Sequence, residues 1–309
     1  MEKILVEPDE LIRRIGHDIN PWGGLLLTRR DGALKCLIAR HEEGPHPRAA
    51  IASQVIEAML DRLPASLQDQ VAAWSDIVMQ GEDNPLNIAS LGWQAKSGWR
   101  IRLLPDVFYF EQRGYEDFAT VITPWAEREA KVFWRGSSTG QPFLHHNQLP
   151  FLPRYKLCQA ARSIGPICDA KMVAVVQAAN AHEHDLIVEH LKSNGLFGSY
   201  ERMEDMHRYK FIIDIDGNAN AWNFLARMRL GCCILRVESE WHQWFANRFV
   251  AWKHFVPVRA DLSDLAEKVD WCLSHDAEAS IIAARGCALA KAIRFDNEMD
   301  LASQRFFAF

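Results

Sequence analysis

Two aspartates end an apolar run in the second half of the chain, which reads Tyr209-Lys-Phe-Ile-Ile-Asp-Ile-Asp-Gly-Asn218. Paired carboxylates at this spacing can hold a divalent cation against phosphate groups. Alternation along a strand sends Asp214 and Asp216 to the same face of the apolar run, and a metal site would need further oxygen ligands that the sequence does not identify. We expect structural roles for the pair and no bound metal, and we keep metal binding as the alternative.

A turn and a helix are predicted to follow this strand. Asp216–Asn218 has the composition of a turn, and 219–230 has the apolar spacing of a helix, with Asn218 or Asn220 as its N-cap. The start of such a helix presents free backbone N–H groups and a positive dipole, which suit a pyrophosphate. An ordinary crossover without a ligand is the alternative.

A second candidate for anion binding is Trp134-Arg-Gly-Ser-Ser-Thr-Gly140. Backbone N–H groups and hydroxyls in turns of small residues bind anions, and Arg135 is able to hold a phosphate through two hydrogen bonds. The segment lacks Gly-Lys-Ser/Thr, so it is not a P-loop. A plain surface turn is equally compatible with these residues.

A third candidate for ligand binding is the segment Glu238-Ser-Glu240, which follows another predicted strand. A carboxylate in this position can accept hydrogen bonds from ribose hydroxyls. The alternative is that Ser239 caps the next helix, with Glu240 in its first turn.

The elements that must position these groups alternate along the chain. In the second half we expect strands over 130–134, 171–176, 210–215, 232–237 and 255–258, and helices over 155–162, 185–193, 219–230, 241–249, 264–272 and from 276 onward. Such alternation predicts a parallel sheet covered by helices on both faces. In the first part we expect two strands around an Asp31-Gly32 turn, a helix over 47–63, and strands over 98–104 and 119–122.

Length and composition limit the class of protein. A chain of 309 residues predicts two domains that share a cleft. Its net charge of −5 argues against a nucleic-acid-binding protein. The 7 scattered cysteines contain no C-x-x-C pair, which favours reduced thiols. Without a predicted signal peptide or membrane span, we expect a cytoplasmic protein, at most peripheral to the inner membrane. The 11 tryptophans mildly favour a sugar ligand, although filling of cores explains them as well.

Several of these segments together resemble the Rumi / capsule-associated-protein glycosyltransferases (glycosyltransferase family 90), in their bacterial lipopolysaccharide-modifying branch. The resemblance covers about residues 100–290. It is carried, in order, by Trp134-Arg-Gly-Ser137, Arg154-x-x-Leu157, Tyr209–Asn218, Gly231-Cys232, Glu238-Ser-Glu-Trp241, Trp252-Lys-His-Phe-Val-Pro-Val258 and Asp261-Leu-Ser-Asp-Leu265.

The resemblance implies an α/β protein with a GT-B-like fold, in which two Rossmann-like lobes hold a UDP-sugar in the cleft between them. We expect an N-terminal lobe over 1–153 that carries the acceptor and the base, a donor-binding lobe over 154–290, and a C-terminal helix over 291–309 that packs back on the first lobe. The family's reaction is an inverting, metal-independent transfer of a hexose or pentose to a hydroxyl group. The implied acceptor is a glycan or glycolipid, such as lipopolysaccharide or another surface polysaccharide, and no cofactor is implied besides the donor substrate.

The resemblance also implies site residues. Ser137 would contact the donor, Arg154 would bind the diphosphate, and Glu240 keeps the family's Glu-Trp pair. The nucleotide site would be lined by Arg135, Gly136, Asp216, Gly217, Asn218, Ala219, Asn220, Ala221, Trp222 and Asn223. The characterised enzymes have arginine where this chain has Asn223, so one phosphate-binding cation is missing, and Arg227 lies one turn further as a replacement.

The catalytic base is implied less directly. The eukaryotic enzymes carry an aspartate about ten residues after a Leu-Pro-Asp segment, which is Leu104-Pro-Asp106 here. Asp117 or Glu116 fits with a small shift and Glu111 with a larger one. An inverting transfer needs a carboxylate that accepts the proton of the acceptor, and we assign this role to Asp117, with Glu116 as the second candidate. Two rival functions stay open: a metal-dependent transferase that uses Asp214 and Asp216, and a nucleotide-sugar-binding protein without activity.

Overall fold

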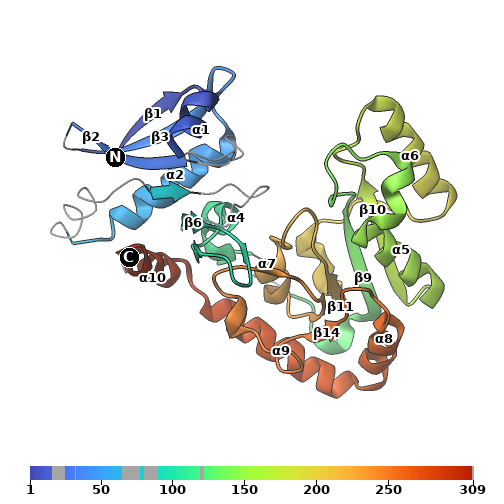
Figure 1. The fold of residues 1–309 in the computed structure, drawn as a ribbon. Helices are drawn as coiled ribbons and strands as arrows, with labels where there is room; N and C mark the ends of the chain where they lie inside the picture. The colour runs from blue at the N-terminus through green and yellow to red at the C-terminus, as the bar shows by residue number, and fades with distance from the viewer. Residues whose placement is uncertain (16–24, 32, 65–76, 80–89, 119–121, 308–309) are drawn as a thin grey trace. The chain divides into compact units, whose positions relative to one another are not determined.

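The protein is described by a computed structural model that covers residues 1–15, 25–31, 33–64, 77–79, 90–118 and 122–307 (Figure 1). It forms two compact units. Unit 1 consists of Met1–Glu116, Glu240–Ala246 and Ile293–Phe309, and unit 2 of Asp117–Ser239 and Asn247–Ala292. These units differ from the lobes expected from the sequence, because unit 2 begins at Asp117 rather than at 154 and because 240–246 returns to unit 1.

Unit 2 is built on a five-stranded parallel sheet. In spatial order its strands are β10 (Cys168–Ala174), β9 (Glu129–Ser137), β11 (Tyr209–Asp214), β12 (Cys233–Val237) and β14 (Val256–Val258). Counted along the chain, this is the order 2-1-3-4-5 of a doubly wound α/β domain. The α/β class and the parallel sheet are thus confirmed.

Helices cover this sheet (Figure 1). They are α5 (Pro153–Ile164), α6 (Ala181–Ser193), α7 (Phe224–Arg229), α8 (Leu265–Ser274) and α9 (Asp276–Ala292), with short 3-10 turns η2 (Trp125–Glu127), η3 (His146–Phe151) and η4 (Met203–Arg208). α5 packs against β10, α8 against β14, and α9 against β12 and α7. Apolar side chains that point inward from the strands, such as Phe211, Ile213 and Leu235, are fully buried with Leu157 of α5.

Unit 1 contains a mixed sheet. Its strands are β1 (Glu2–Val6), β2 (Leu25–Arg30), β3 (Ala33–His41), β4 (Gly44–Pro45), β5 (Ile77–Met79), β6 (Ser90–Gly92) and β8 (Ile101–Leu103), while β7 (Ala95–Lys96) pairs with β13 (Trp241–His242). Its helices are α1 (Pro8–Ile15), α2 (Pro47–Leu60), α4 (Val107–Glu111) and α10 (Phe295–Phe307), with a 3-10 turn η1 (Arg113–Tyr115). The predicted strand pair around Asp31 is confirmed as antiparallel β2 and β3.

The last helix of the chain packs within unit 1. The Ser303 hydroxyl of α10 donates to the carbonyl of Met59 in α2 over 2.9 Å, and Arg62 pairs with Asp296 at 2.9 Å. None of the helices in the described ranges is both long enough and apolar enough to cross a bilayer.

Two predicted helices are wrong. Residues 241–249 form strand β13, which pairs with β7, and the 3-10 turn η5 (Ala246–Arg248), because Trp241 and His242 find backbone partners in Lys96 and Ala95. The helix expected over 219–230 begins only at Phe224. Of the strand expected over 119–122, residues 119–121 lie outside the described residues.

Candidate functional site

The strand order of unit 2 places a topological switch point between β9 and β11. The chain leaves β9 toward β10 on one side and returns to β11 on the other. In open α/β sheets, ligands bind outside the carboxyl ends of the strands at such a point. The residues that follow Ser137 and Asp214, which end these two strands, therefore form the candidate site.

Arg154, in the first turn of α5, joins the ends of the two strands. Its guanidinium donates to the carbonyls of Asp216 (2.9 Å), Ser137 (3.2 Å) and Ile215 (3.4 Å). Burial, and less strongly the nearby Arg227, lower the pKa of Arg154 to about 10, so it stays protonated at neutral pH. Within the described residues no carboxylate pairs with it. The switch point thus holds a cation without a matching anion.

The loops after β9 and β11 also touch directly. The amide of Gly140 donates to Asn218 Oδ1 over 2.8 Å. A Cβ atom on Gly217 would lie 2.4 Å from Thr139 Oγ1 and 2.9 Å from Arg154 Nη2. A side chain at 217 would force Thr139 or Arg154 to move, so the close approach favours glycine at this position.

We predict that Gly217→Ala lowers the affinity for UDP, the ligand that the sequence resemblance implies, by about 5- to 100-fold, because overpacking worth about 1–3 kcal/mol would be relieved by displacing Arg154 or Thr139. Isothermal titration with UDP measures the effect. Gly44→Ala is the matched control, since its Cβ would meet nothing within 4 Å. Thr139→Ala in the Gly217→Ala background removes the closest contact and should restore part of the affinity. Unchanged affinity in Gly217→Ala would contradict this packing.

Asp216 organises the turn that follows β11. Its carboxylate accepts from the amide of Ala221 over 2.9 Å and from the hydroxyl of Ser239, which follows β12. Burial raises the pKa of Asp216 to about 6 against the lowering effect of the Ser239 hydrogen bond. The side chain therefore fixes the loop rather than facing a ligand as a free carboxylate.

The same contacts explain why α7 starts late. Asp216 binds the amide of Ala221, and the amide of Gly217 donates to the carbonyl of Ala219 over 3.0 Å, so 217–221 forms a closed turn. Asn223, which is exposed, takes the N-cap position instead of Asn218 or Asn220. With six residues, α7 is too short for the long-helix dipole that we expected to act on a phosphate.

Asn220 lies inside this turn and is only 5% exposed. Neither Oδ1 nor Nδ2 of its amide finds a hydrogen-bond partner among the described residues. Its neighbours Ala219 and Ala221 are buried and Trp222 is partly buried. A buried amide without partners is costly, so Asn220 is a group whose hydrogen-bonding capacity a ligand would satisfy.

The two aspartates of the first motif have protein partners. Arg227 Nη1 donates to Asp214 Oδ1 over 2.6 Å, and both side chains are buried. Asp216 is held by Ala221 and Ser239. No group of three or more potential metal ligands occurs in the parts of the chain that are described. A metal ion at this motif would have to displace Arg227, which also cannot act as a free phosphate-binding cation while it neutralises Asp214.

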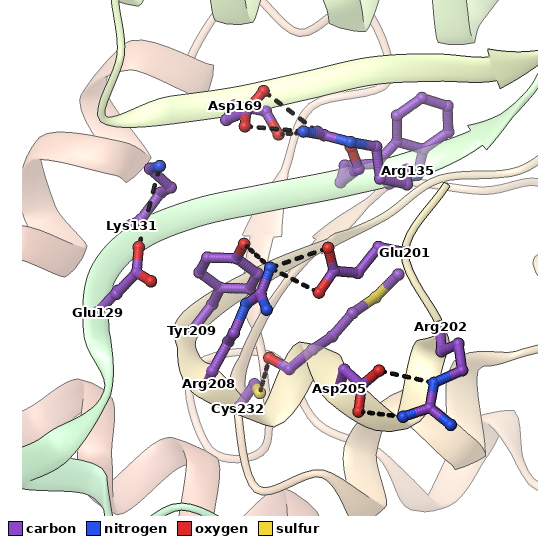
Figure 2. Close-up of polar contacts among 12 residues, drawn as sticks. Glu129, Lys131, Arg135, Asp169, Glu201, Arg202, Asp205, Arg208, Tyr209 and Cys232 are labelled. Carbon is purple, nitrogen blue, oxygen red and sulfur yellow. Dashed lines mark hydrogen bonds and ion pairs between the residues drawn. The ribbon is translucent and has the colours of Figure 1, made fainter. Parts of the chain in front are cut away.

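Arg135 lies on the same strand as Ser137 but has another function. Figure 2 shows its guanidinium facing Asp169, with Nη2 to Oδ2 at 2.8 Å and Nη1 to Oδ1 at 3.1 Å. It also lies 4.2 Å from the ring centroid of Phe133. This ion pair ties β9 to β10. Gly136 makes room for the indole of Trp134, which a Cβ there would approach to 2.4 Å.

The two serines that follow Gly136 differ. Ser138 is buried, and its hydroxyl donates to the Val176 carbonyl over 3.0 Å and accepts from the Val176 amide over 2.9 Å. Ser137 is partly exposed, and its hydroxyl has no hydrogen bond within the described residues. Ser137 is therefore the serine that is available to a ligand.

Two of the predicted site residues belong to unit 1, and a third is the first residue of unit 2. Glu240 belongs to unit 1, where it pairs with Lys96 at 2.7 Å. Glu116, also in unit 1, accepts from the Phe295 amide at the start of α10 over 2.9 Å. Asp117 is the first residue of unit 2, is exposed, and forms no hydrogen bond or ion pair with another described residue. Of the two base candidates, Asp117 has the uncommitted carboxylate.

Asp106, from the Leu-Pro-Asp segment, is a buried structural acid. It caps α4 by accepting from the Tyr109 amide over 2.8 Å, and Gln243 Nε2 donates to its other oxygen over 3.0 Å. Burial raises the pKa of Asp106 to about 7, against the lowering effect of these hydrogen bonds. Between about pH 4 and 7 the folded protein therefore keeps a proton on Asp106 that the unfolded chain releases. The free energy of unfolding consequently falls as the pH rises through this range.

We predict that Asp106→Asn removes this pH dependence. The free energy of unfolding of the variant should exceed that of the wild type by no more than about 1 kcal/mol near pH 4.5. It should exceed it by on the order of 2–4 kcal/mol at pH 8, where the wild type must ionise a buried carboxyl group. Urea unfolding at pH 4.5, 6 and 8 measures the difference, and the exposed Asp61→Asn is the control. A difference that does not change with pH would show that Asp106 titrates normally.

Sequence reasoning missed two residues of the site. Ser239 was considered only as an alternative helix cap, whereas its hydroxyl donates to Asp216, and Thr139 was considered only as part of a small-residue turn. The available signal was position, because both residues follow the carboxyl ends of parallel strands, β12 and β9, which lie beside β11.

Comparisons with known proteins place the chain in a family. A family model described as Glycosyl transferase family 90 matches residues 117–301. Protein O-glucosyltransferase 2 of Danio rerio is 28% identical over 167 residues, which are 54% of this chain and 29% of that protein. An uncharacterized protein, 179R of Invertebrate iridescent virus 6, is 31% identical over 171 residues, 50% of this chain and 14% of the relative. The chain thus spans less than a third of these curated relatives.

Among solved structures, HepE of Anabaena in complex with UDP-glucose has a TM-score of 0.41 and 11% sequence identity, over 57% of this chain and 48% of HepE. A TM-score of 0.41 is too low to support an argument from this likeness. The description of the fold therefore rests on the strand order of unit 2.

Proposed function

This chain belongs to glycosyl transferase family 90, and we propose that it transfers a hexose or pentose from a UDP-sugar to a hydroxyl group of a glycan acceptor. The transfer inverts the anomeric carbon and needs no metal ion. Unit 2 is the donor-binding lobe of this chain. The acceptor is a lipopolysaccharide or other surface-glycan precursor on the cytoplasmic side of the inner membrane.

The observation that supports this proposal most directly is Arg154. It is a cation without a paired carboxylate in the described part of the chain, and it spans the carbonyls at the ends of β9 and β11. A diphosphate at the switch point would supply the missing negative charge. Ser137 and Asn220 are close in the chain to these strand ends, and both have hydrogen-bonding capacity that is unused among the described residues.

In the proposed step, the acceptor oxygen attacks the anomeric carbon while the bond from that carbon to the UDP oxygen breaks. The acceptor proton passes to the carboxylate of Asp117, and the negative charge that develops on the departing UDP is stabilised by Arg154. The bond from the acceptor oxygen to the anomeric carbon replaces the bond from that carbon to UDP. The products are therefore the glycosylated acceptor, UDP and a proton.

A thermal-shift screen with UDP-, GDP- and CMP-sugars tests the donor class. Ligand present at about 100 times its dissociation constant stabilises the folded state by about 2.7 kcal/mol, so selective stabilisation by UDP-sugars is expected. Stabilisation only by GDP- or CMP-sugars would overturn the choice of donor. If UDP binds but no sugar is turned over in the presence of acceptor glycans, the chain is a nucleotide-sugar-binding protein.

The rival that uses metal is tested separately. Since Arg227 and Ser239 already occupy Asp214 and Asp216, we expect turnover to be unchanged by EDTA. Loss of turnover in EDTA with recovery in manganese would favour the metal-dependent enzyme and contradict the proposed mechanism.

A further inference from the structure

The 3-10 turn η1, which follows α4, has an unusual backbone. Arg113, Gly114 and Tyr115 have consecutive φ angles of 43°, 70° and 57°, in the left-handed region that residues with a side chain rarely adopt. Elsewhere in the described ranges, positive φ angles occur at single residues. Such strain persists only where the surrounding structure enforces it, and it is concentrated at functional sites. The proposed base, Asp117, follows this turn by two residues.

Aromatic packing holds Tyr115 in its left-handed conformation. Tyr115 is only 4% exposed, and its ring meets that of Tyr109 edge to face, with centroids 6.2 Å apart. Tyr109 in turn stacks on Phe295 at 6.0 Å and meets Trp244 at 4.9 Å. These rings come from three separate stretches of the chain that all belong to unit 1. The strained turn is therefore anchored in the core of that unit.

The other two residues of the turn pack on the start of α10. A Cβ atom on Gly114 would lie 3.1 Å from Phe295 Cβ and 3.0 Å from the Tyr109 hydroxyl. Arg113 is exposed, and the central carbon of its guanidinium lies 5.0 Å from the centroid of the Phe295 ring. The turn thus has little room to adopt another backbone conformation while α10 is in place.

Glu116 fixes the next position of the chain. Its carboxylate accepts from the Phe295 amide over 2.9 Å and lies 3.5 Å from Arg294 Nε. The Cα atom of Asp117 is one peptide unit, about 3.8 Å, from that of Glu116. The carboxylate of Asp117 forms no hydrogen bond or ion pair with another described residue. Its position is therefore set by the backbone that precedes it and not by contacts of its own.

We propose that Tyr115 is a positioning residue for the proton transfer and acts by fixing the backbone to which Asp117 is attached. This inference rests on the proposed function, in which Asp117 accepts the proton of the acceptor hydroxyl. A general base must lie within hydrogen-bonding distance of that proton, and a misplacement of about 1 Å can cost about 100-fold in rate. A relaxed turn would send the chain in another direction and move the carboxylate.

Tyr115→Ala tests this role. We expect kcat to fall about 10- to 100-fold, while the dissociation constant of UDP stays within about twofold, because the donor-site residues are unchanged. Tyr115→Phe keeps the ring against Tyr109 and should restore most of the lost activity. Kinetics at saturating UDP-sugar and isothermal titration with UDP measure the two quantities. A UDP affinity that falls in parallel with kcat would indicate general damage to the fold and would overturn the inference.

A second background separates positioning from a merely structural role. If Tyr115 acts through Asp117, Tyr115→Ala should lower the residual kcat of Asp117→Asn by less than about twofold. An equal loss in both backgrounds would overturn this inference alone, and so would a wild-type kcat in Tyr115→Ala. Full activity of Asp117→Asn would overturn the base assignment of the proposed function together with this inference.

Gly114→Ala and Gly98→Ala form a matched pair of further variants. Both glycines lie in unit 1 at positive φ, 70° and 83°, but a Cβ atom on Gly98 would meet nothing within 4 Å. We expect kcat to fall about tenfold in Gly114→Ala, which displaces the turn, and to stay within about twofold in Gly98→Ala. If Tyr115→Ala does not fold, this pair decides, since equal kcat values in the two variants would overturn the inference.

Discussion

Under the proposed function, we expect replacement of Arg154 by methionine to lower kcat/KM for the UDP-sugar by roughly 10²- to 10³-fold, equivalent to about 3–4 kcal/mol of transition-state stabilisation. Arg154 is the cation at the switch point that has no carboxylate partner in the described structure, and its charge is available to the diphosphate. UDP affinity should fall as well, because ground state and transition state both carry the diphosphate. Steady-state kinetics and titration with UDP measure the two effects.

The control for this variant lies on the same helix. Arg162 is exposed, and among the described residues its guanidinium donates to the carbonyl of Asn194 over 2.7 Å. Arg162→Met removes the same charge at the surface and should leave both constants within about twofold. Arg154→Lys keeps the charge but cannot reach three carbonyls at once, so its activity should lie between wild type and Arg154→Met. Equal kinetics for Arg154→Met and Arg162→Met would contradict the assigned role.

If Asp117 is the base, as proposed, we expect its replacement by asparagine to lower kcat by about 10²- to 10⁴-fold, the range expected when a general base is removed, and to leave UDP affinity within about twofold. The carboxylate of Asp117 is exposed and has no partner within the described residues, so the substitution should not affect folding. Single-turnover measurements separate the chemical step from product release.

Glu116→Gln is the comparison variant for the base. Glu116 accepts from the Phe295 amide over 2.9 Å and lies 3.5 Å from Arg294, so an amide oxygen can replace it as the acceptor and kcat should change only a few fold. A large loss of turnover in Glu116→Gln with an active Asp117→Asn would transfer the role to Glu116. If both variants keep full activity, Glu111 becomes the candidate.

The fold of unit 2 was largely predictable, because buried parallel strands are continuous apolar runs. Cys168–Ala174, Tyr209–Asp214 and Cys233–Val237 were each found within a few residues. The irregular turn before α7 was not predicted, because apolar spacing continues through Ala219 and Ala221 while one hydrogen bond from Ala221 to Asp216 decides the backbone. Likewise, Trp241–His242 reads as a helix start until its distant partner β7 is known.

The position of the candidate site at the strand ends could be predicted from the sequence. Which of its arginines lacks a carboxylate partner could not. The sequence offers Arg135, Arg154 and Arg227 as cations near the same strand ends, with Arg154 assigned to the diphosphate through the resemblance and Arg227 as a replacement for the arginine missing at Asn223. Asp169 pairs with Arg135 and Asp214 pairs with Arg227, and only the folded chain shows that Arg154 has no such partner among the described residues. Arg135 meets Asp169 on the neighbouring strand and Arg227 reaches Asp214 from helix α7, and apolar spacing along the chain does not specify either contact.

The division of the chain into units sets an order for folding during synthesis. Unit 1 takes up Glu240–Ala246 and Ile293–Phe309 in addition to the first 116 residues. Its core contacts need these late segments: Gln243 binds Asp106, and Trp244 Nε1 donates to the buried Glu298 over 2.9 Å. Unit 2 is complete once Ala292 has left the ribosome. The unit whose strands are translated first is therefore completed last, and its early segments depend on the remaining chain for protection from aggregation.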